Sequence, residues 1–139
     1  VEEPTLDELH DSEDFINAHF AQHALADEAW GLLADAFLAK GLCDDQRRLL
    51  KRRCDFASSA YPGLSGAHAW ALEVYGDALL HSHASEREPR SDSEKKSQQD
   101  AVTAHRCYAD ALAILSLMFG NDNEYTTQVQ AKLALLQHE

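Results

Sequence analysis

The hydrophobic residues of this chain recur every three or four positions, which is the period of an amphipathic α-helix. No stretch alternates polar and apolar residues with the period of two that a half-buried strand requires. Gly41, Pro62 and Gly120 interrupt the pattern where helices are expected to end. The pattern therefore predicts an all-α fold with six helices. The expected ranges are about 12–24, 27–40, 44–61 and 66–82 for the first four, and 124–137 for the last; the fifth is expected to begin between residues 94 and 100 and to end at 119.

The remaining segments are polar. Residues 1–11 are predicted to form an acidic, flexible arm, with Asp11 or Ser12 as the N-cap of the first helix. Residues 84–97 hold no apolar side chain larger than alanine, which predicts a solvated insertion loop. A chain of 139 residues can bury one core, so residues 1–139 are interpreted as a single helical domain.

Two of the predicted helices share a spacing of large and small residues. Each has large residues at the first, fourth and eighth places and a small residue at the fifth, which would let a paired helix approach closely. The two segments are offset by 42 residues: Trp30, Leu33, Ala34 and Phe37 in one, and Leu72, Tyr75, Gly76 and Leu79 in the other. The paired helix is expected to carry small, large and small residues in turn, as Ala104, Tyr108 and Ala111 do.

This spacing resembles the tetratricopeptide repeat. The stretch from Ala104 to Ile114 is similar to the repeats of kinesin light chain. The same elements, with Tyr61-Pro62, Trp70 and Gly120, resemble the C-terminal helical domain of SET/MYND lysine methyltransferases. The Asn-His-x-Cys stretch of a SET domain is absent, and three cysteines cannot build the MYND double zinc site. The resemblance thus implies tetratricopeptide-like antiparallel helix pairs in a short α-solenoid, without methyltransferase activity.

The repeat register also predicts a ligand-binding face. In such repeats the first helix of each pair lines a concave surface that takes a peptide. Acids stand on that face here, which favours a basic or apolar peptide over an acidic one. The alternative is a solvated acidic face in which Trp70 belongs to the core. The candidate partner-binding residues are Glu28, Asp35, Leu38, Trp70, Glu73, Asp77 and His81.

One basic cluster stands against the acidic background. Arg47, Arg48, Lys51 and Arg52 follow a single stripe of the third predicted helix. The stripe could bind an acidic partner or the acids of residues 1–14, in the same or a neighbouring chain; alternatively it is a solvated face balanced by neighbouring aspartates.

Composition excludes several classes of function. Lys and Arg number 12 against 24 Asp and Glu, a formal net charge of −12, which disfavours nucleic acid as a partner. No apolar run is long enough to span a membrane. Three cysteines without a CxxC pair indicate reduced thiols, and hence a cytoplasmic or nuclear location.

No chemistry-bearing motif is present. The sequence has no nucleophile elbow and no Gly-rich phosphate loop, so it is not expected to be an enzyme or to need a cofactor. His19 and His23 have a spacing that can chelate a metal, but they also lie on the apolar stripe of their helix, so no metal site is predicted.

Taken together, these patterns predict a protein–protein interaction module that binds a peptide or partner protein on a concave helical surface. Two alternatives remain open. The chain could be the C-terminal helical lobe of a SET/MYND-type methyltransferase without its catalytic part. It could also be a structural subunit that self-associates.

Overall fold

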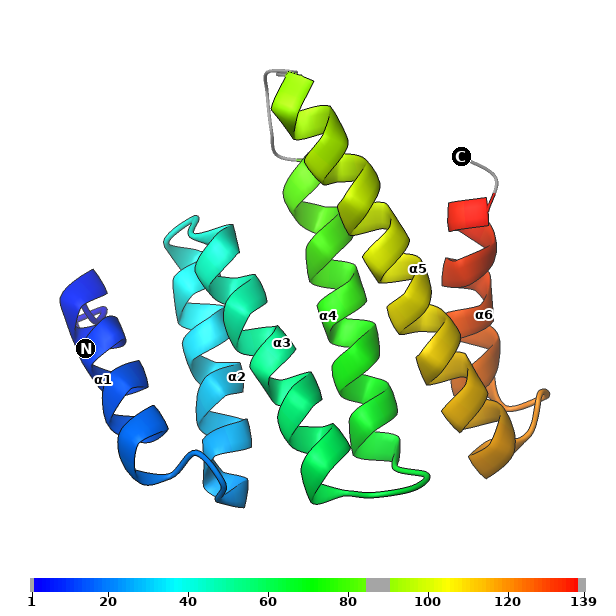
Figure 1. The fold of residues 1–139 in the computed structure, drawn as a ribbon, viewed down its shortest axis with the longest axis horizontal. Helices are drawn as coiled ribbons and strands as arrows, with labels where there is room; N and C mark the ends of the chain where they lie inside the picture. The colour runs from blue at the N-terminus through cyan, green and yellow to red at the C-terminus, as the bar shows by residue number, and fades with distance from the viewer. Residues whose placement is uncertain (1, 85–90, 138–139) are drawn as a thin grey trace. The chain divides into compact units, whose positions relative to one another are not determined.

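A computed structural model describes residues 2–84 and 91–137, with side chains over 2–81 and 95–137. The described residues form six α-helices and no strand, which confirms the all-α prediction. The helices are α1 (Leu6–His19), α2 (Ala24–Ala39), α3 (Cys43–Ala60), α4 (Gly66–Ala84), α5 (Ser91–Phe119) and α6 (Glu124–Gln137), labelled in Figure 1. Contacts within the chain group them into two compact units, Val1–Phe56 and Ala57–Glu139, with the boundary inside α3.

The first helix begins earlier than the sequence suggested. The N-cap is Thr5, and not Asp11 or Ser12, because Thr5 and Glu8 form a reciprocal capping box. The Glu8 N–H donates to Thr5 Oγ1 at 3.2 Å, and the Thr5 N–H donates to Glu8 Oε2 at 3.3 Å. Residues 6–11, expected to be part of a flexible arm, are therefore helical.

The predicted first helix also ends sooner, at His19 instead of near residue 24. His23 caps the next helix, because its Nδ1 accepts the N–H of Leu25 at 3.1 Å. Gly41 and Gly120 have φ angles of 77° and 81°, and each directly follows a helix end as predicted.

The prediction of a loop over 84–97 is wrong for residues 91–97, which are helical. These residues contain neither glycine nor proline, and they extend a helix already anchored in the core further along the chain. Ala84, also part of the predicted loop, is the last residue of α4, and residues 85–90 lie outside the described residues.

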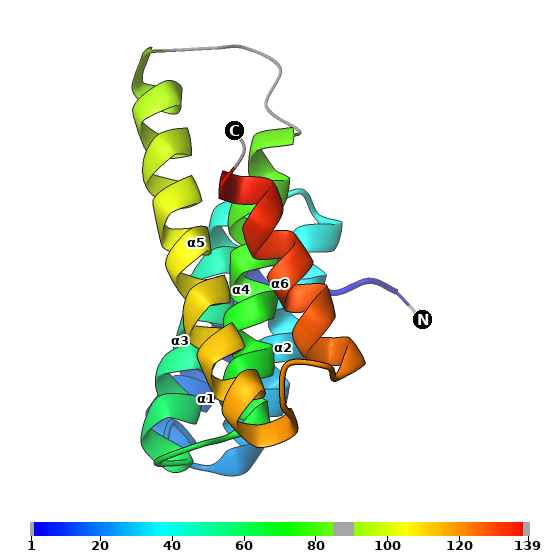
Figure 2. The same ribbon diagram turned by 90° about the vertical axis from the view of Figure 1, so that its right-hand side faces the viewer.

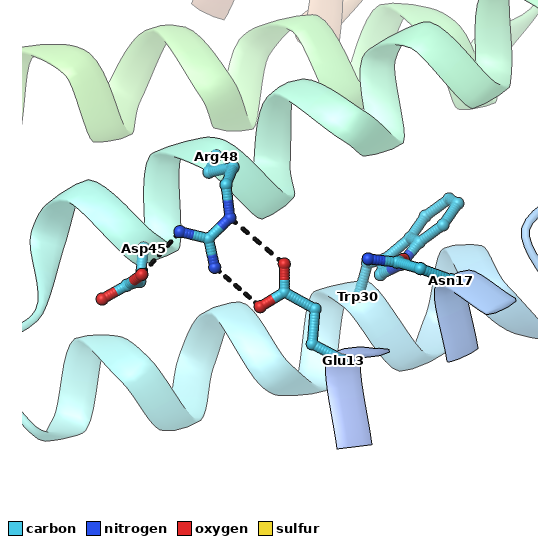
Figure 3. A network of polar contacts seen from close by, with 5 residues as sticks. All are labelled: Glu13, Asn17, Trp30, Asp45 and Arg48. Atoms are coloured by element: carbon cyan, nitrogen blue, oxygen red, sulfur yellow. Dashed lines mark hydrogen bonds and ion pairs between the residues drawn. The ribbon is translucent and has the colours of Figure 1, made fainter. Parts of the chain in front are cut away.

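In the unit Val1–Phe56, α2 packs against both α1 and α3. Trp30 is 1% exposed, its Nε1–H donates to Asn17 Oδ1 of α1 at 3.0 Å, and its ring meets Phe56 of α3 edge-on at 5.9 Å between centroids. Ala34 and Phe37 are also fully buried, as the repeat spacing predicted. Figure 3 shows Trp30 beside Asn17.

In the unit Ala57–Glu139, α4 and α5 run antiparallel. Gly66 lies near Met118 at one end of the pair, and Gly76 lies against Tyr108 further along. A Cβ atom on Gly76 would come within 2.8 Å of Tyr108 Cε1, so glycine permits this approach. Figure 2 shows α6 alongside this pair, and its Val129 is fully buried.

Candidate functional site

The unit Ala57–Glu139 contains a pocket of about 410 Å³ formed by α4, α5 and α6. Each helix contributes residues one or more turns apart, so that the pocket follows the helix axes. We call it the α4–α6 pocket. Its lining residues are Asp77 and Leu80 of α4, Ser97, Ala101 and Tyr108 of α5, and Lys132, Leu135 and Leu136 of α6.

The close approach of α4 and α5 positions the polar end of this pocket. Because Gly76 has no side chain, the ring of Tyr108 lies directly against α4. Tyr108 is only 2% exposed, yet its hydroxyl reaches Asp77 and donates to Oδ1 at 2.6 Å. The ring is thus fixed on one side by packing and at its tip by a charge-assisted hydrogen bond.

The helix α6 contributes Lys132 to the polar end of the pocket. Its Nζ lies 3.1 Å from Oδ1 and 3.0 Å from Oδ2 of Asp77, and 3.5 Å from Oε2 of Glu73. The hydroxyl of Tyr125 lies 3.5 Å from Oε1 of the same glutamate. Two carboxylates of α4 therefore share one ammonium group and two phenols.

The carboxylates make this end of the pocket electronegative. Burial raises the pKa of Tyr108 well above its usual range, and the hydrogen bond to Asp77 and the nearby charges add to the effect. Burial, with the charge of Glu73, raises the pKa of Tyr125 to about 12. Burial acts to lower the pKa of Lys132, but Asp77 and Glu73 outweigh it and raise that pKa above its usual value. All three shifts act in the same direction as the ordinary pKa values, which already leave both phenols neutral and the lysine charged at neutral pH.

The remaining wall of the pocket is mostly apolar, with Ser97 as its one polar residue, and part of it is exposed to solvent. Leu135 is 70% exposed, whereas Leu80 and Leu136 are half-buried. An exposed leucine alone is ordinary on a protein surface. Beside a pocket with a fixed polar end it supplies apolar area that a ligand could cover.

The structure divides the predicted partner-binding residues between the two units. In the unit Ala57–Glu139, Asp77 lines the pocket and Glu73 lies buried behind it. Trp70 is 48% exposed and His81 is exposed, but neither lines the pocket. In the unit Val1–Phe56, the other three lie on α2: Glu28 and Asp35 are exposed and Leu38 is half-buried.

The predicted basic stripe is engaged within its own unit. Arg48 forms a two-pronged contact with Glu13, from Nε to Oε1 at 3.1 Å and from Nη2 to Oε2 at 2.6 Å (Figure 3). The same guanidinium also pairs with Asp45. The hydrogen bonds to Glu13 raise the pKa of Arg48 above its usual value. Partial burial acts to lower this pKa, and the contact with Asp45 acts to raise it further. The proposed contact with the acids of residues 1–14 is therefore present within the chain.

The other members of the stripe have different environments. Arg47 is buried, contrary to the solvated face that was one reading of the stripe. Lys51 pairs with Asp55 at 3.4 Å on the surface. Arg52 lies over the ring of Trp30, 5.2 Å from its centroid.

Sequence reasoning missed Lys132 as a functional candidate. Its partner Asp77 is 55 positions away, so the contact depends on how α6 packs against α4. One signal was available, because Lys132 is the only Lys or Arg after Arg106. The single basic residue of a helix is a candidate for pairing with an acid of a neighbouring helix.

His19 and His23 contact aromatic rings. His19 lies 4.7 Å from Phe15 between ring centroids, and His23 lies 6.2 Å from Phe20. Among the residues whose side chains are described, 2–81 and 95–137, no group of three or more His, Cys, Asp or Glu residues is placed to hold a metal ion. None of the helices in those ranges combines the length and the apolar character that a membrane crossing needs.

Comparison with known proteins assigns no family. No protein-family profile matches the chain, and no curated protein matches it.

Proposed function

We propose that this chain is a protein-interaction module that binds a segment of a partner protein in the α4–α6 pocket. The observation that carries the proposal is the pocket itself, in which a polar end fixed by Tyr108 and Asp77 adjoins an exposed apolar wall at Leu135. Peptide sites commonly combine apolar area for affinity with a few fixed polar groups for orientation. The role proposed is binding without catalysis.

The antiparallel pairing of α4 with α5 and the position of α6 beside them support a tetratricopeptide-like reading of this unit. In that reading α4 and α6 are first helices of successive repeats, which supply the ligand-binding face. We also propose a cytoplasmic or nuclear location. Three cysteines, an odd number without a CxxC pair, are typical of proteins in a reducing compartment.

The test is a selection of random displayed peptides on the full chain, with Leu135→Asp as the pocket variant. Leu32→Asp is the matched control, because Leu32 is 66% exposed on α2 and lies outside the pocket. We expect peptides that bind the wild-type chain and the control but lose about 10-fold or more in affinity for the pocket variant. If every enriched peptide binds the two variants equally, the pocket is not the binding site.

Self-association is a second candidate, favoured by a separate surface on the unit Val1–Phe56. Phe15, Phe20 and Leu25 are 58%, 41% and 61% exposed. The rings of Phe15 and Phe20 lie 6.0 Å apart, so they form one apolar patch. Light scattering of the wild-type chain and of Phe15→Glu tests this idea. A concentration-dependent dimer that the substitution abolishes supports it, and a monomer at every concentration refutes it.

A further inference from the structure

The α4–α6 pocket has a charged end at Asp77 and Lys132 and is mostly apolar beyond it, with Ser97 as the one polar residue there. Along α5 its lining runs from Tyr108 to Ser97, a distance of about 16 Å at the rise of an α-helix. Along α4 it passes from Asp77 to Leu80, and along α6 from Lys132 to Leu135 and Leu136. These two steps each cover about one turn in the direction away from Tyr108. A ligand that follows the pocket would meet the charged groups first and the leucines about one turn later.

The polar end carries more negative than positive charge. The carboxylates of Asp77 and Glu73 face the single ammonium group of Lys132. The Glu73 side chain is 12% exposed, so it is largely committed to the interior. The Asp77 side chain is 47% exposed, so one side of its carboxylate can still be reached from solvent. A positively charged group is the complement of this end.

We infer that the ligand of the pocket is a basic amphipathic segment, with an arginine or lysine at Asp77 and an apolar residue about one helical turn away on the wall formed by Leu80 and Leu135. This inference rests on the proposed function and specifies its ligand. The basic group would hydrogen-bond the open side of the Asp77 carboxylate. The apolar residue would cover the leucine that is now exposed to water.

In this arrangement Lys132 is a competitor of the ligand. It occupies both Asp77 oxygens at 3.1 and 3.0 Å, so an incoming cation must share that carboxylate or displace the ammonium group. Removing the lysine charge should therefore strengthen the binding of a basic peptide. If the pocket instead takes an acidic peptide, Lys132 is the group that binds it, and the same change should abolish binding. The two ligand classes thus predict effects of opposite sign.

The experiment uses synthetic peptides taken from the displayed selection and measures their dissociation constants by fluorescence anisotropy. The chains compared are wild type, Lys132→Met and Asp77→Asn. For a basic peptide we expect Lys132→Met to tighten binding by about 3- to 10-fold and Asp77→Asn to weaken it by about 10-fold. Changing the peptide's basic residue to glutamine should weaken binding to the wild-type chain by a similar factor.

The peptide substitution keeps the test decisive if a protein variant folds poorly, because it is measured on the wild-type chain. Helicity and melting of both variants are followed by circular dichroism, and Lys132→Gln replaces the methionine variant if that one unfolds.

Three results would overturn the inference. Acidic peptides that lose binding on Lys132→Met would overturn the ligand class while leaving the proposed function intact. Apolar peptides whose dissociation constants are unchanged by both Lys132→Met and Asp77→Asn would also overturn the ligand class and leave the proposed function intact. If no peptide distinguishes wild type from Leu135→Asp, the proposed function fails together with the inference.

Discussion

Replacing Gly76 by alanine should destabilise the unit Ala57–Glu139, although the same change would stabilise an isolated helix. Alanine is favoured over glycine in a helix interior by about 1 kcal/mol. Here the new Cβ would lie 2.8 Å from Cε1 and 3.2 Å from Cδ1 and Cζ of Tyr108. These three contacts are with a rigid ring, so the ring itself or the helix must move.

The ring has little freedom to move. Tyr108 is 2% exposed, and its hydroxyl is held at 2.6 Å from Asp77. Overpacking of a buried site costs about 1–3 kcal/mol. A shift of the ring also weakens a hydrogen bond to a charged group, which is worth about 1.5–3 kcal/mol. After subtraction of the helix propensity gain, we expect Gly76→Ala to lower the free energy of unfolding by about 2 kcal/mol.

The assay is urea denaturation followed by circular dichroism, arranged as a double-mutant cycle with Tyr108→Leu. In the leucine background the clash is absent, so Gly76→Ala should be neutral or should stabilise by up to about 1 kcal/mol. Gly66→Ala is the control in the same helix, because the nearest atom to the Cβ there would be Met118 Cε at 4.0 Å, an ordinary contact. An equal cost of Gly76→Ala in both backgrounds would refute the reasoning.

Three further predictions concern the ion pair between the buried Glu13 and the half-exposed Arg48, a helix cap and the tyrosines. Glu13→Gln should destabilise the unit Val1–Phe56 by about 1–3 kcal/mol in a urea titration, because it weakens two hydrogen bonds at a side chain that is only 8% exposed. Asp55→Asn is the matched control, because Asp55 belongs to a surface ion pair, and it should cost under about 0.5 kcal/mol in the same titration. Thr5→Ala should lower stability by about 1 kcal/mol and reduce amide-exchange protection at the start of α1, whereas unchanged protection would exclude the capping box. The pKa of Tyr125 is raised to about 12 by burial and by nearby carboxylates, so the stability it contributes is complete below pH 10 and is lost as the pH rises through 12. A pH titration that records tyrosinate absorbance and helicity together tests this prediction. Tyr125→Phe is the control, because it removes the absorbance change that Tyr125 contributes. Ionisation of every tyrosine at the ordinary pKa would contradict the prediction.

Local patterns along the chain predicted the six helices, and they predicted the buried residues of α2 and α5 well. The small residue at Gly76 was expected to let a paired helix approach closely, and Tyr108 of α5 lies against it. Gly41 and Gly120 were expected at helix ends and adopt the left-handed conformation that requires them. Such features depend on residues close in the sequence or on a repeated spacing, so one sequence is enough to find them.

Two kinds of feature were harder to predict: the choice between several acceptable N-cap residues, and contacts that depend on long-range register. The cap at Thr5 was missed because Asp11 and Ser12 are equally acceptable N-cap residues, and only the reciprocal bond with Glu8 decides between them. Asp77 was identified as a candidate from its place in the repeat, whereas Lys132 was not, because nothing local indicates which acid it meets. Which acid Arg48 meets was likewise left open, since any of seven carboxylates in residues 1–14 could have been its partner.

The two tryptophans lie one in each unit, in contrasting surroundings. Trp30 is 1% exposed in the unit Val1–Phe56, and Trp70 is 48% exposed in the unit Ala57–Glu139. Indole emission shifts to longer wavelength on contact with water, so each unit has its own intrinsic fluorophore with a distinct starting spectrum. In Trp70→Phe the remaining signal reports unfolding of the first unit alone, and in Trp30→Phe that of the second. Coincident midpoints for the two single-tryptophan chains would show that the units unfold as one cooperative system, and separate midpoints would give each unit a stability of its own.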